Sequence, residues 1–214
     1  MSIKTSKEII KLAFNLYNLD EIAISFNGGK DNTVMLVMIL KYLFKKFGNY
    51  HDNLPLCVYF KQKYEFVEMI DFINQFDKDI GLNLVTYQMD IKSGLKKLKE
   101  DYPKIKCIFM GTRRSDPYSN HLTSFTATDD DWPAYMRVFP LLDWNYQLIW
   151  KFILTYQIPY CPLYNLGYTS ISDISNTSKN PYLVYYDKYG NIRYKPAYYL
   201  TDESKERAGR NKIP

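Results

Sequence analysis

The chain has 214 residues, which is enough for one well-buried domain and too few for two of ordinary size. Hydrophobic residues make up 46% and charged residues 24%, a balance that excludes a disordered or membrane-embedded protein. The formal net charge of +5 would suit a polyanionic small molecule, and the lysines of residues 92–106 are more typical of a solvated helix face than of a nucleic-acid footprint, so charge alone does not decide the partner. No run approaches the ~20 apolar residues of a membrane span, and the start lacks a signal-peptide core. We therefore expect a cytoplasmic monomer that binds neither nucleic acid nor membrane.

The first two thirds of the chain alternates between helical and strand-like patterns. Strands that alternate with helices predict an α/β fold with a doubly wound, mostly parallel sheet. The predicted elements in chain order are a helix at 6–18 capped by Ser6, a strand at 22–26, a helix at 31–47 ended by Gly48, a strand at 56–60, a helix at 64–80 ended by Gly81, a strand at 82–87, a helix at 93–101 and a strand at 105–110.

The second part of the chain has a different composition. From about residue 121 it is rich in Pro, Trp and Tyr, and only residues 146–156 predict a clear helix. We expect residues 1–120 to form a sheet core and residues 121–214 to form a ligand-binding lobe with a C-terminal tail. Ligands of open doubly wound sheets bind beyond the carboxyl ends of the strands. The loops at 27–30, after residue 60 and at 111–119 are therefore expected to face one crevice.

The heptad SFNGGKD at residues 25–31 joins a predicted strand to a predicted helix. Gly28 and Gly29 let the backbone approach a ligand closely, and the free N–H groups at the helix start favour bound phosphate. Lys30 could add a positive charge or face away from the site, and Asp31 can hold Mg²⁺. The heptad matches neither GxxxxGK[ST] nor GxGxxG, and taken alone it also fits a plain strand-to-helix turn.

The segment GTRRSDPYS at residues 111–119 follows the fourth predicted strand. Gly111 permits close approach, Arg113 and Arg114 offer fork-shaped donors for phosphate, and Asp116 is a second carboxylate. As an isolated string, the Asp-Pro pair also fits the start of a turn. Its position at a strand end favours a place in the same crevice as the first loop.

Five motifs resemble one family when they are taken together. SFNGGKD resembles the SxGGKD loop of PP-loop ATP pyrophosphatases and PAPS reductase-like proteins. GTRRSDPYS, TDDDWPAYMRVFPLLDWNYQLIWKF (128–152), PYCPLYNLGYTS (159–170) and ERAGR (206–210) follow it in the order found in eukaryotic FAD synthases. The resemblance covers about residues 22–210. It implies a PAPS reductase-like fold with a flavin-binding lobe, and an enzyme that uses Mg²⁺, ATP and FMN to make FAD and pyrophosphate.

The resemblance and the chemistry of the residues together give a predicted site. The FMN phosphate is already ionised at neutral pH, so no general base is needed, and neither His51 nor His121 stands in a base position. We expect catalytic roles for Asn27, Asp31, Asp116 and Arg207, with Asp31 and Asp116 at the metal. The ATP-binding set is Ser25, Phe26, Asn27, Gly28, Gly29, Lys30, Asp31, Tyr59, Gly111 and Arg113. The flavin-binding set is Asp116, Asp129, Trp132, Arg137, Arg207 and Arg210.

Several of these residues have simpler interpretations without the resemblance. Trp132 before Pro133 then fits a core aromatic at a rigid turn, and Arg207 and Arg210 fit a solvated tail. The sequence also departs from the family pattern, for example at Asn32, where many relatives have Cys, and we assign no chemistry to that position.

Three rival functions use other features. A sulfonucleotide reductase needs a nucleophilic cysteine near the C-terminus, and none follows Cys161. A tRNA-thiolating enzyme with a CxxC pair is excluded because Cys57, Cys107 and Cys161 lie far apart, and the chain has no added basic RNA-binding module. A non-catalytic flavin- or nucleotide-binding module leaves the acidic and basic residues of the predicted site unexplained.

Overall fold

A computed structural model describes residues 2–49 and 53–210 of the chain. Its centre is a six-stranded sheet in the order β3-β2-β1-β4-β6-β5, in which only the edge strand β5 runs antiparallel. This confirms the predicted α/β fold with a mostly parallel sheet. The strands are β1 (Ile22–Ser25), β2 (Leu56–Phe60), β3 (Leu84–Tyr87), β4 (Cys107–Phe109), β5 (Phe125–Ala127) and β6 (Met136–Val138).

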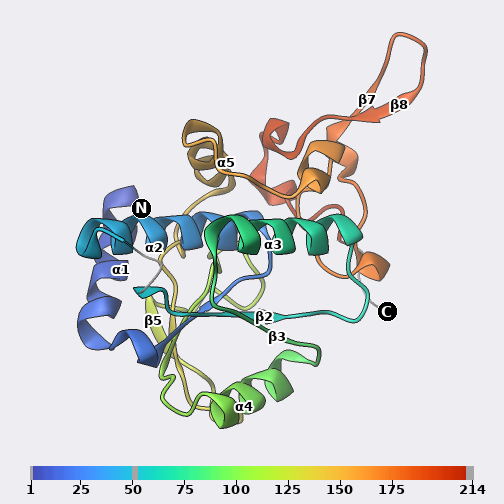
Figure 1. The fold of residues 1–214 in the computed structure, drawn as a ribbon. Coiled ribbons are helices and arrows are strands. Elements are labelled where there is room, and N and C mark those ends of the chain that lie inside the picture. The colour runs from blue at the N-terminus through green and yellow to red at the C-terminus, as the bar shows by residue number, and fades with distance from the viewer. Residues whose placement is uncertain (1, 50–52, 211–214) are drawn as a thin grey trace.

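Helices cover both faces of this sheet, as a doubly wound fold requires (Figure 1). Side chains of β1 alternate between the faces: Ile22 and Ile24 join the large core with α1, α2, α3 and α5, and Ala23 joins a smaller core under α4. The helices are α1 (Ile3–Leu16), α2 (Lys30–Phe47), α3 (Val67–Ile80), α4 (Ile91–Asp101) and α5 (Tyr146–Thr155). Gly48 and Gly81 end α2 and α3 with positive φ angles, as predicted.

The start of α1 differs from the prediction. Ser2 is the N-cap, and its hydroxyl accepts a hydrogen bond from the Thr5 amide, so the helix begins one turn before Ser6. Ser6 is buried instead and accepts a hydrogen bond from Trp144 Nε1 at 2.8 Å. The predicted cap at Ser6 is therefore wrong, and this serine ties α1 to the C-terminal part of the chain.

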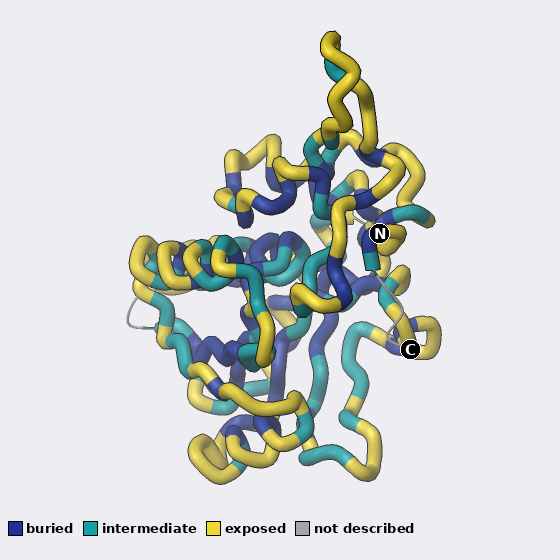
Figure 2. The backbone as a smooth tube through the Cα atoms, turned by 90° about the vertical axis from the view of Figure 1, so that its right-hand side faces the viewer, coloured by how far each residue is buried: buried dark blue, intermediate teal, exposed yellow. Residues whose placement is uncertain are grey.

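The expected division at residue 120 does not coincide with a boundary in the structure. Strands β5 and β6 come after that residue and extend the sheet beside β4. After β6, the chain forms α5, short 3-10 helices such as η3 (Pro162–Leu166), and the hairpin β7 (Val184–Tyr186) to β8 (Ile192–Tyr194). This hairpin projects from the molecule and is largely exposed (Figures 1 and 2). The remaining 3-10 helices are η1 (Leu19–Glu21), η4 (Ile174–Asn176), η5 (Pro181–Leu183), η6 (Ala197–Tyr199) and η7 (Glu203–Lys205).

Candidate active site

The loops that follow β1 and β4 meet at the carboxyl edge of the sheet, as the sequence predicts. Asp31, at the start of α2, faces Arg113 from the loop after β4, and both lie beside Glu206 of the C-terminal segment. Residues of that segment come after the β7–β8 hairpin in the chain and return to the body of the molecule (Figure 1). Three stretches of chain therefore meet at this edge, namely the loop after β1, the loop after β4 and the C-terminal segment.

The phosphate loop has the backbone form expected of it. Gly28 has φ +70°, and Gly29 is the N-cap of α2 without a side-chain cap. The Lys30 amide donates to the Tyr164 hydroxyl at 3.0 Å, so the part of the first turn that remains for a ligand begins at Asp31. Asn27 Oδ1 accepts hydrogen bonds from the Gly29 amide at 3.0 Å and from Asn32 Nδ2 at 2.7 Å. Asn27 therefore shapes the loop that it belongs to.

Asn32 has a role that sequence reasoning missed. Its Oδ1 accepts a hydrogen bond from the Gly111 amide at 2.8 Å, while its Nδ2 holds Asn27. A Cβ atom at Gly111 would lie 2.4 Å from that oxygen, so only glycine permits this approach. Asn32 thus joins the two predicted phosphate-binding loops through one amide side chain.

Four charged side chains form a buried cluster behind the loops. Lys30 Nζ lies 2.9 Å from Asp31 Oδ2 and 2.6 Å from Glu206 Oε1. Arg113 Nε lies 2.8 Å from Asp31 Oδ1, and Arg113 Nη2 lies 2.6 Å from Glu206 Oε1. Burial lowers the pKa of Lys30, but Asp31 and Glu206 outweigh burial and raise it above its ordinary value. The Lys30 charge is therefore used inside the protein and is not presented to the crevice.

Three guanidinium nitrogens at the site are buried without a hydrogen-bond partner among the described residues: Arg113 Nε, which is only ion-paired with Asp31, Arg113 Nη1 and Arg210 Nε. Buried donors are nearly always satisfied, and phosphate oxygens are strong acceptors for guanidinium groups. Arg210 also donates to Ser170 Oγ at 3.4 Å, and burial together with the nearby charge of Arg207 lowers its pKa. The ERAGR segment is thus a docked part of the site, with Arg207 exposed beside it.

Asp116 lies close to the cluster. Its Oδ2 accepts a hydrogen bond from the Arg113 amide at 2.9 Å. Burial raises its pKa, and the negative charges of Asp31 and Glu206 raise it further. Among the described residues, no group of three or more His, Cys, Asp or Glu side chains could hold a metal alone. Asp31 and Asp116 supply two carboxylates, the number that Mg²⁺ uses together with substrate phosphates, and both oxygens of Asp31 also face a cation, Lys30 or Arg113.

Two expected ATP-binding side chains lie in the core instead of the crevice. Phe26 is fully buried and packs on Phe76 with ring centroids 5.3 Å apart. Tyr59 is 5% exposed, and its hydroxyl is hydrogen-bonded to Glu65. Only backbone groups at these two positions can contact a nucleotide, whereas Ser25 is half-buried at the end of β1. Strand alternation points these two aromatic rings at the helices of the large core.

Arg114 also differs from its expected role as a phosphate fork. Its Nε lies 2.5 Å from Asp143 Oδ1, and its Nη1 donates to the carbonyls of Asn120 and Leu122 at 3.2 Å each. These contacts of Arg114 stabilise the conformation of the loop after β4.

The three residues expected at the flavin ring form a group of their own. Arg137 Nη2 lies 3.6 Å from Asp129 Oδ1, and the Trp132 amide donates to the Asp129 carbonyl at 2.9 Å. Half-buried Trp132 packs in the core under α4, where Phe60 and Met110 also pack. Since those two residues stand at the carboxyl ends of β2 and β4, this core connects the group to the edge that carries the phosphate loop.

All three cysteines are buried and free. Burial raises the pKa of Cys57 and Cys107 to about 12 and that of Cys161 to about 11, so the reactive thiolate is scarce at neutral pH. This environment does not suit the nucleophilic cysteine of a sulfonucleotide reductase.

A thiol assay checks that conclusion. With the native protein at pH 7.5, we expect 5,5′-dithiobis(2-nitrobenzoate) to react with none of the three cysteines within minutes, because each thiol is both buried and protonated. In denaturant, all three should react. Fast reaction of a single thiol in the native protein would show that a cysteine is accessible and activated.

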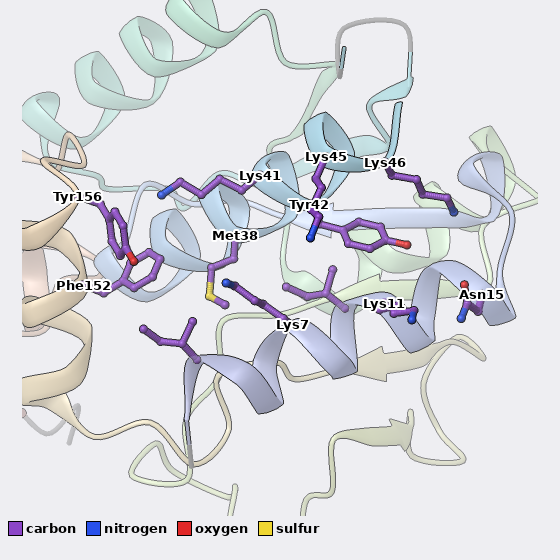
Figure 3. A pocket seen from close by; sticks show the side chains of 12 residues that line it. Lys7, Lys11, Asn15, Met38, Lys41, Tyr42, Lys45, Lys46, Phe152 and Tyr156 are labelled. Atoms are coloured by element: carbon purple, nitrogen blue, oxygen red, sulfur yellow. The ribbon is translucent and has the colours of Figure 1, made fainter. Parts of the chain in front are cut away.

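A separate cavity of about 700 Å³ lies between α1, α2 and the end of α5 (Figure 3). Its lining contains none of the predicted site residues. Its lysines supply exposed control positions away from the carboxyl edge, namely Lys7, Lys11, Lys41, Lys45 and Lys46.

None of the helices in residues 2–49 and 53–210 has the length and apolar character to cross a membrane.

Comparison with known proteins agrees with this geometry. Residues 21–179 match the family described as phosphoadenosine phosphosulfate reductase domain. A probable FAD synthase of Schizosaccharomyces pombe is 38% identical, over 98% of this chain and 78% of that protein. A probable FAD synthase of Caenorhabditis elegans is 34% identical over 99% of this chain, which spans only 40% of that longer protein.

Solved structures give the same family. The FMN adenylyltransferase of Candida glabrata, in complex with FMN and the ATP analogue AMPCPP, superposes with a TM-score of 0.89 at 27% identity. The match covers 97% of this chain and 88% of that one. Together with the two loops, the carboxylates and the docked ERAGR segment, these matches show that the chain belongs to the FAD synthase family of PAPS reductase-like proteins.

Proposed function

We propose that this protein is an FMN adenylyltransferase, which transfers AMP from ATP to the phosphate of FMN and releases pyrophosphate. The observation that carries the proposal is the match of nearly the whole chain to a structure that holds FMN and an ATP analogue together. The proposal includes Mg²⁺, a monomeric state and a cytoplasmic location, which metal titration, sedimentation and cell fractionation test.

The chemistry requires alignment and charge neutralisation. An oxygen of the FMN phosphate attacks the α-phosphorus of ATP, a new P–O bond forms, and the bond between the α- and β-phosphates breaks. The FMN phosphate is already an anion at neutral pH, so no base has to take a proton from it. His121 is exposed, and His51 lies outside the described residues. The site accordingly works through donors and charges that surround the phosphates.

Each part of the crevice has a role in this reaction. The amides of the first turn of α2 from Asp31 onward bind the pyrophosphate end of ATP, whereas the Gly29 and Lys30 amides are held by Asn27 and Tyr164. The unpartnered Nη1 of Arg113 and Nε of Arg210 offer two further donors, and exposed Arg207 adds a third cation. Asp31 and Asp116 hold Mg²⁺, which when bound neutralises charge on the phosphates and on the departing pyrophosphate.

The flavin half of the proposal places the isoalloxazine ring against Trp132. Asp129 accepts hydrogen bonds from the polar edge of the ring, and Arg137 meets the ribityl chain or the phosphate. The support is that Arg137 pairs with Asp129 at 3.6 Å, that the Trp132 amide donates to the Asp129 carbonyl, and that Trp132 is only half-buried. A stacking platform needs an accessible face of this kind.

Replacing Trp132 with alanine is expected to raise the apparent KM for FMN by about tenfold, because base-sized rings gain about 1–3 kcal/mol from aromatic stacking. The KM for ATP should change little. Initial rates at varied FMN concentration measure this effect. Tyr189→Ala is the matched control, since that ring is 76% exposed in the turn between β7 and β8. An unchanged KM for FMN in Trp132→Ala would show that this side chain does not bind FMN and only packs in the core.

The function itself is tested with purified protein, MgATP and FMN. We expect FAD and pyrophosphate in equal amounts, detected by chromatography and an enzyme-coupled phosphate assay. Riboflavin should not replace FMN, because it lacks the attacking phosphate. A folded protein that binds both ligands and forms no FAD would support a binding module instead, and reduction of a sulfonucleotide by a thiol donor would support the reductase.

A further inference from the structure

Glu206 connects three distant parts of the chain. Its side chain is 8% exposed, and its carboxylate accepts hydrogen bonds from Lys30 Nζ at 2.6 Å and from Arg113 Nη2 at 2.6 Å. Its backbone carbonyl accepts a hydrogen bond from Thr169 Oγ1 at 2.6 Å, and Asn180 Nδ2 donates to the same hydroxyl at 2.8 Å. The phosphate loop, the loop after β4 and the C-terminal segment therefore meet at one buried carboxylate.

The contacts of Arg113 give this carboxylate a specific consequence. Its guanidinium is planar, so two fixed edges determine the direction of the third. Nε lies 2.8 Å from Asp31 Oδ1 as an ion pair, and Nη2 donates to both oxygens of Glu206. Neither Nε nor Nη1 makes a hydrogen bond to a described residue, and of these two nitrogens Nη1 also lacks an ion-pair partner there. Asp31 and Glu206 thus hold the guanidinium in an orientation that leaves one donor for a ligand.

The charges in the cluster mean that removing Glu206 could either strengthen or weaken phosphate binding, depending on its role. Lys30 and Arg113 carry two positive charges, and Asp31 and Glu206 carry two negative charges, so the cluster sums to zero. If Glu206 only neutralised the two cations, removing its charge would leave an excess of +1 and attract phosphate more strongly. If Glu206 orients Arg113, removing it would loosen the donor and weaken phosphate binding.

We propose that Glu206 is a positioning residue, which acts through Arg113 by aiming Nη1 at a phosphate oxygen of the bound pyrophosphate group. The inference rests on the proposed function. It goes beyond that function by assigning a part in phosphate recognition to an acidic residue, whose own charge repels phosphate.

Titration calorimetry with inorganic pyrophosphate and Mg²⁺ tests the inference without requiring turnover. We expect Glu206→Gln to weaken pyrophosphate binding by about tenfold, since a hydrogen bond to a charged group is lost. Arg113→Lys should weaken binding similarly, and the double variant should bind no more weakly than Arg113→Lys alone, because both changes remove the same contact. The stoichiometry should stay at one site, whereas a merely unfolded fraction lowers the stoichiometry and leaves Kd unchanged.

Tighter pyrophosphate binding by Glu206→Gln would overturn the inference and show that Glu206 only neutralises the two cations. Additive losses of affinity in the double variant would show that Glu206 does not act through Arg113. Glu206→Asp keeps the charge and should bind pyrophosphate with an affinity between those of the wild type and Glu206→Gln. If Glu206→Gln does not fold, equal affinity of Glu206→Asp and the wild type would count against the proposal. Lys45→Ala, in the cavity of Figure 3, is the control for a general loss of positive charge. FAD formation by the wild type is measured in parallel, so that failure of the proposed function is seen separately.

Discussion

Replacing Asp116 with alanine is expected to lower kcat for FAD formation by at least about 100-fold, the scale of losing one group that stabilises developing charge. Asp116 lies beside Asp31 at the carboxyl edge and is held by the Arg113 amide. The phosphate loop and the N-terminus of α2 remain intact in this variant. ATP binding, measured by calorimetry, should therefore change by no more than about threefold.

Asp79→Ala is the matched control, because Asp79 is an exposed carboxylate on α3 that accepts a hydrogen bond from Gln75 on the same helix. It should leave kcat and ATP binding unchanged. Full activity of Asp116→Ala would remove Asp116 from the reaction. An equal loss of ATP binding and turnover would instead make it part of the ATP site.

The pKa of Asp116 gives a related expectation. Burial, together with Asp31 and Glu206, raises this pKa above that of an ordinary aspartate, so the folded protein holds the proton more tightly than the unfolded chain does. Activity that needs the ionised carboxylate is then lost, on lowering the pH, at a higher pH than usual. The effect of this group on the free energy of unfolding runs the other way. The stabilisation is fully present below the unfolded-state pKa and is lost as the pH rises through the folded-state pKa. Carbon-13 NMR titration of the carboxyl groups measures the shift directly.

Replacing Gly28 with alanine should have the largest effect on stability. A residue with a side chain pays about 1–2 kcal/mol for the left-handed backbone conformation, and the φ of Gly28 is +70°. Its Cβ would also lie 2.6 Å from Met69 Sδ and 2.8 Å from Ile73 Cγ1, and such overpacking costs about 1–3 kcal/mol more. We expect a total loss of about 2–5 kcal/mol in the free energy of unfolding, measured by urea denaturation.

Gly48→Ala separates the cost of the left-handed backbone conformation from the cost of overpacking. Gly48 ends α2 with φ +73°, and a Cβ there would meet nothing within 4 Å. It should lose only the backbone term of about 1–2 kcal/mol. Equal losses at the two glycines would show that α3 does not pack closely under the phosphate loop.

The sequence predicted the sheet core well because its signals are local. Alternating apolar runs, helix-ending glycines and the loops after strands located β1 to β4 and α2 to α4, with β2 matched at both ends. Strands β5 and β6 were missed, since each is three residues long and too short for a periodic pattern. Their pairing with β4 is set by contacts between distant parts of the chain.

The site was predicted in outline but not in its internal bonding. The motifs located Asp31, Asp116 and the ERAGR segment, but they indicated no role for Glu206, the first residue of that segment. Its proposed role depends on Arg113, which lies 93 residues earlier, and no spacing rule expresses such a contact. Asn32 was missed for a similar reason, because its partner Gly111 lies 79 residues away. The only local signal was a polar amide in the first turn of a helix that faces a glycine-rich loop.

The central claim is that this site transfers the adenylyl group of ATP to the FMN phosphate. Incubating the protein with FMN and ATP labelled at either the α- or the γ-phosphate tests it most directly. The account predicts that α-label appears in FAD and that γ-label appears in pyrophosphate. Appearance of the γ-label in inorganic phosphate with formation of ADP, or of the α-label in free AMP without FAD, would contradict it.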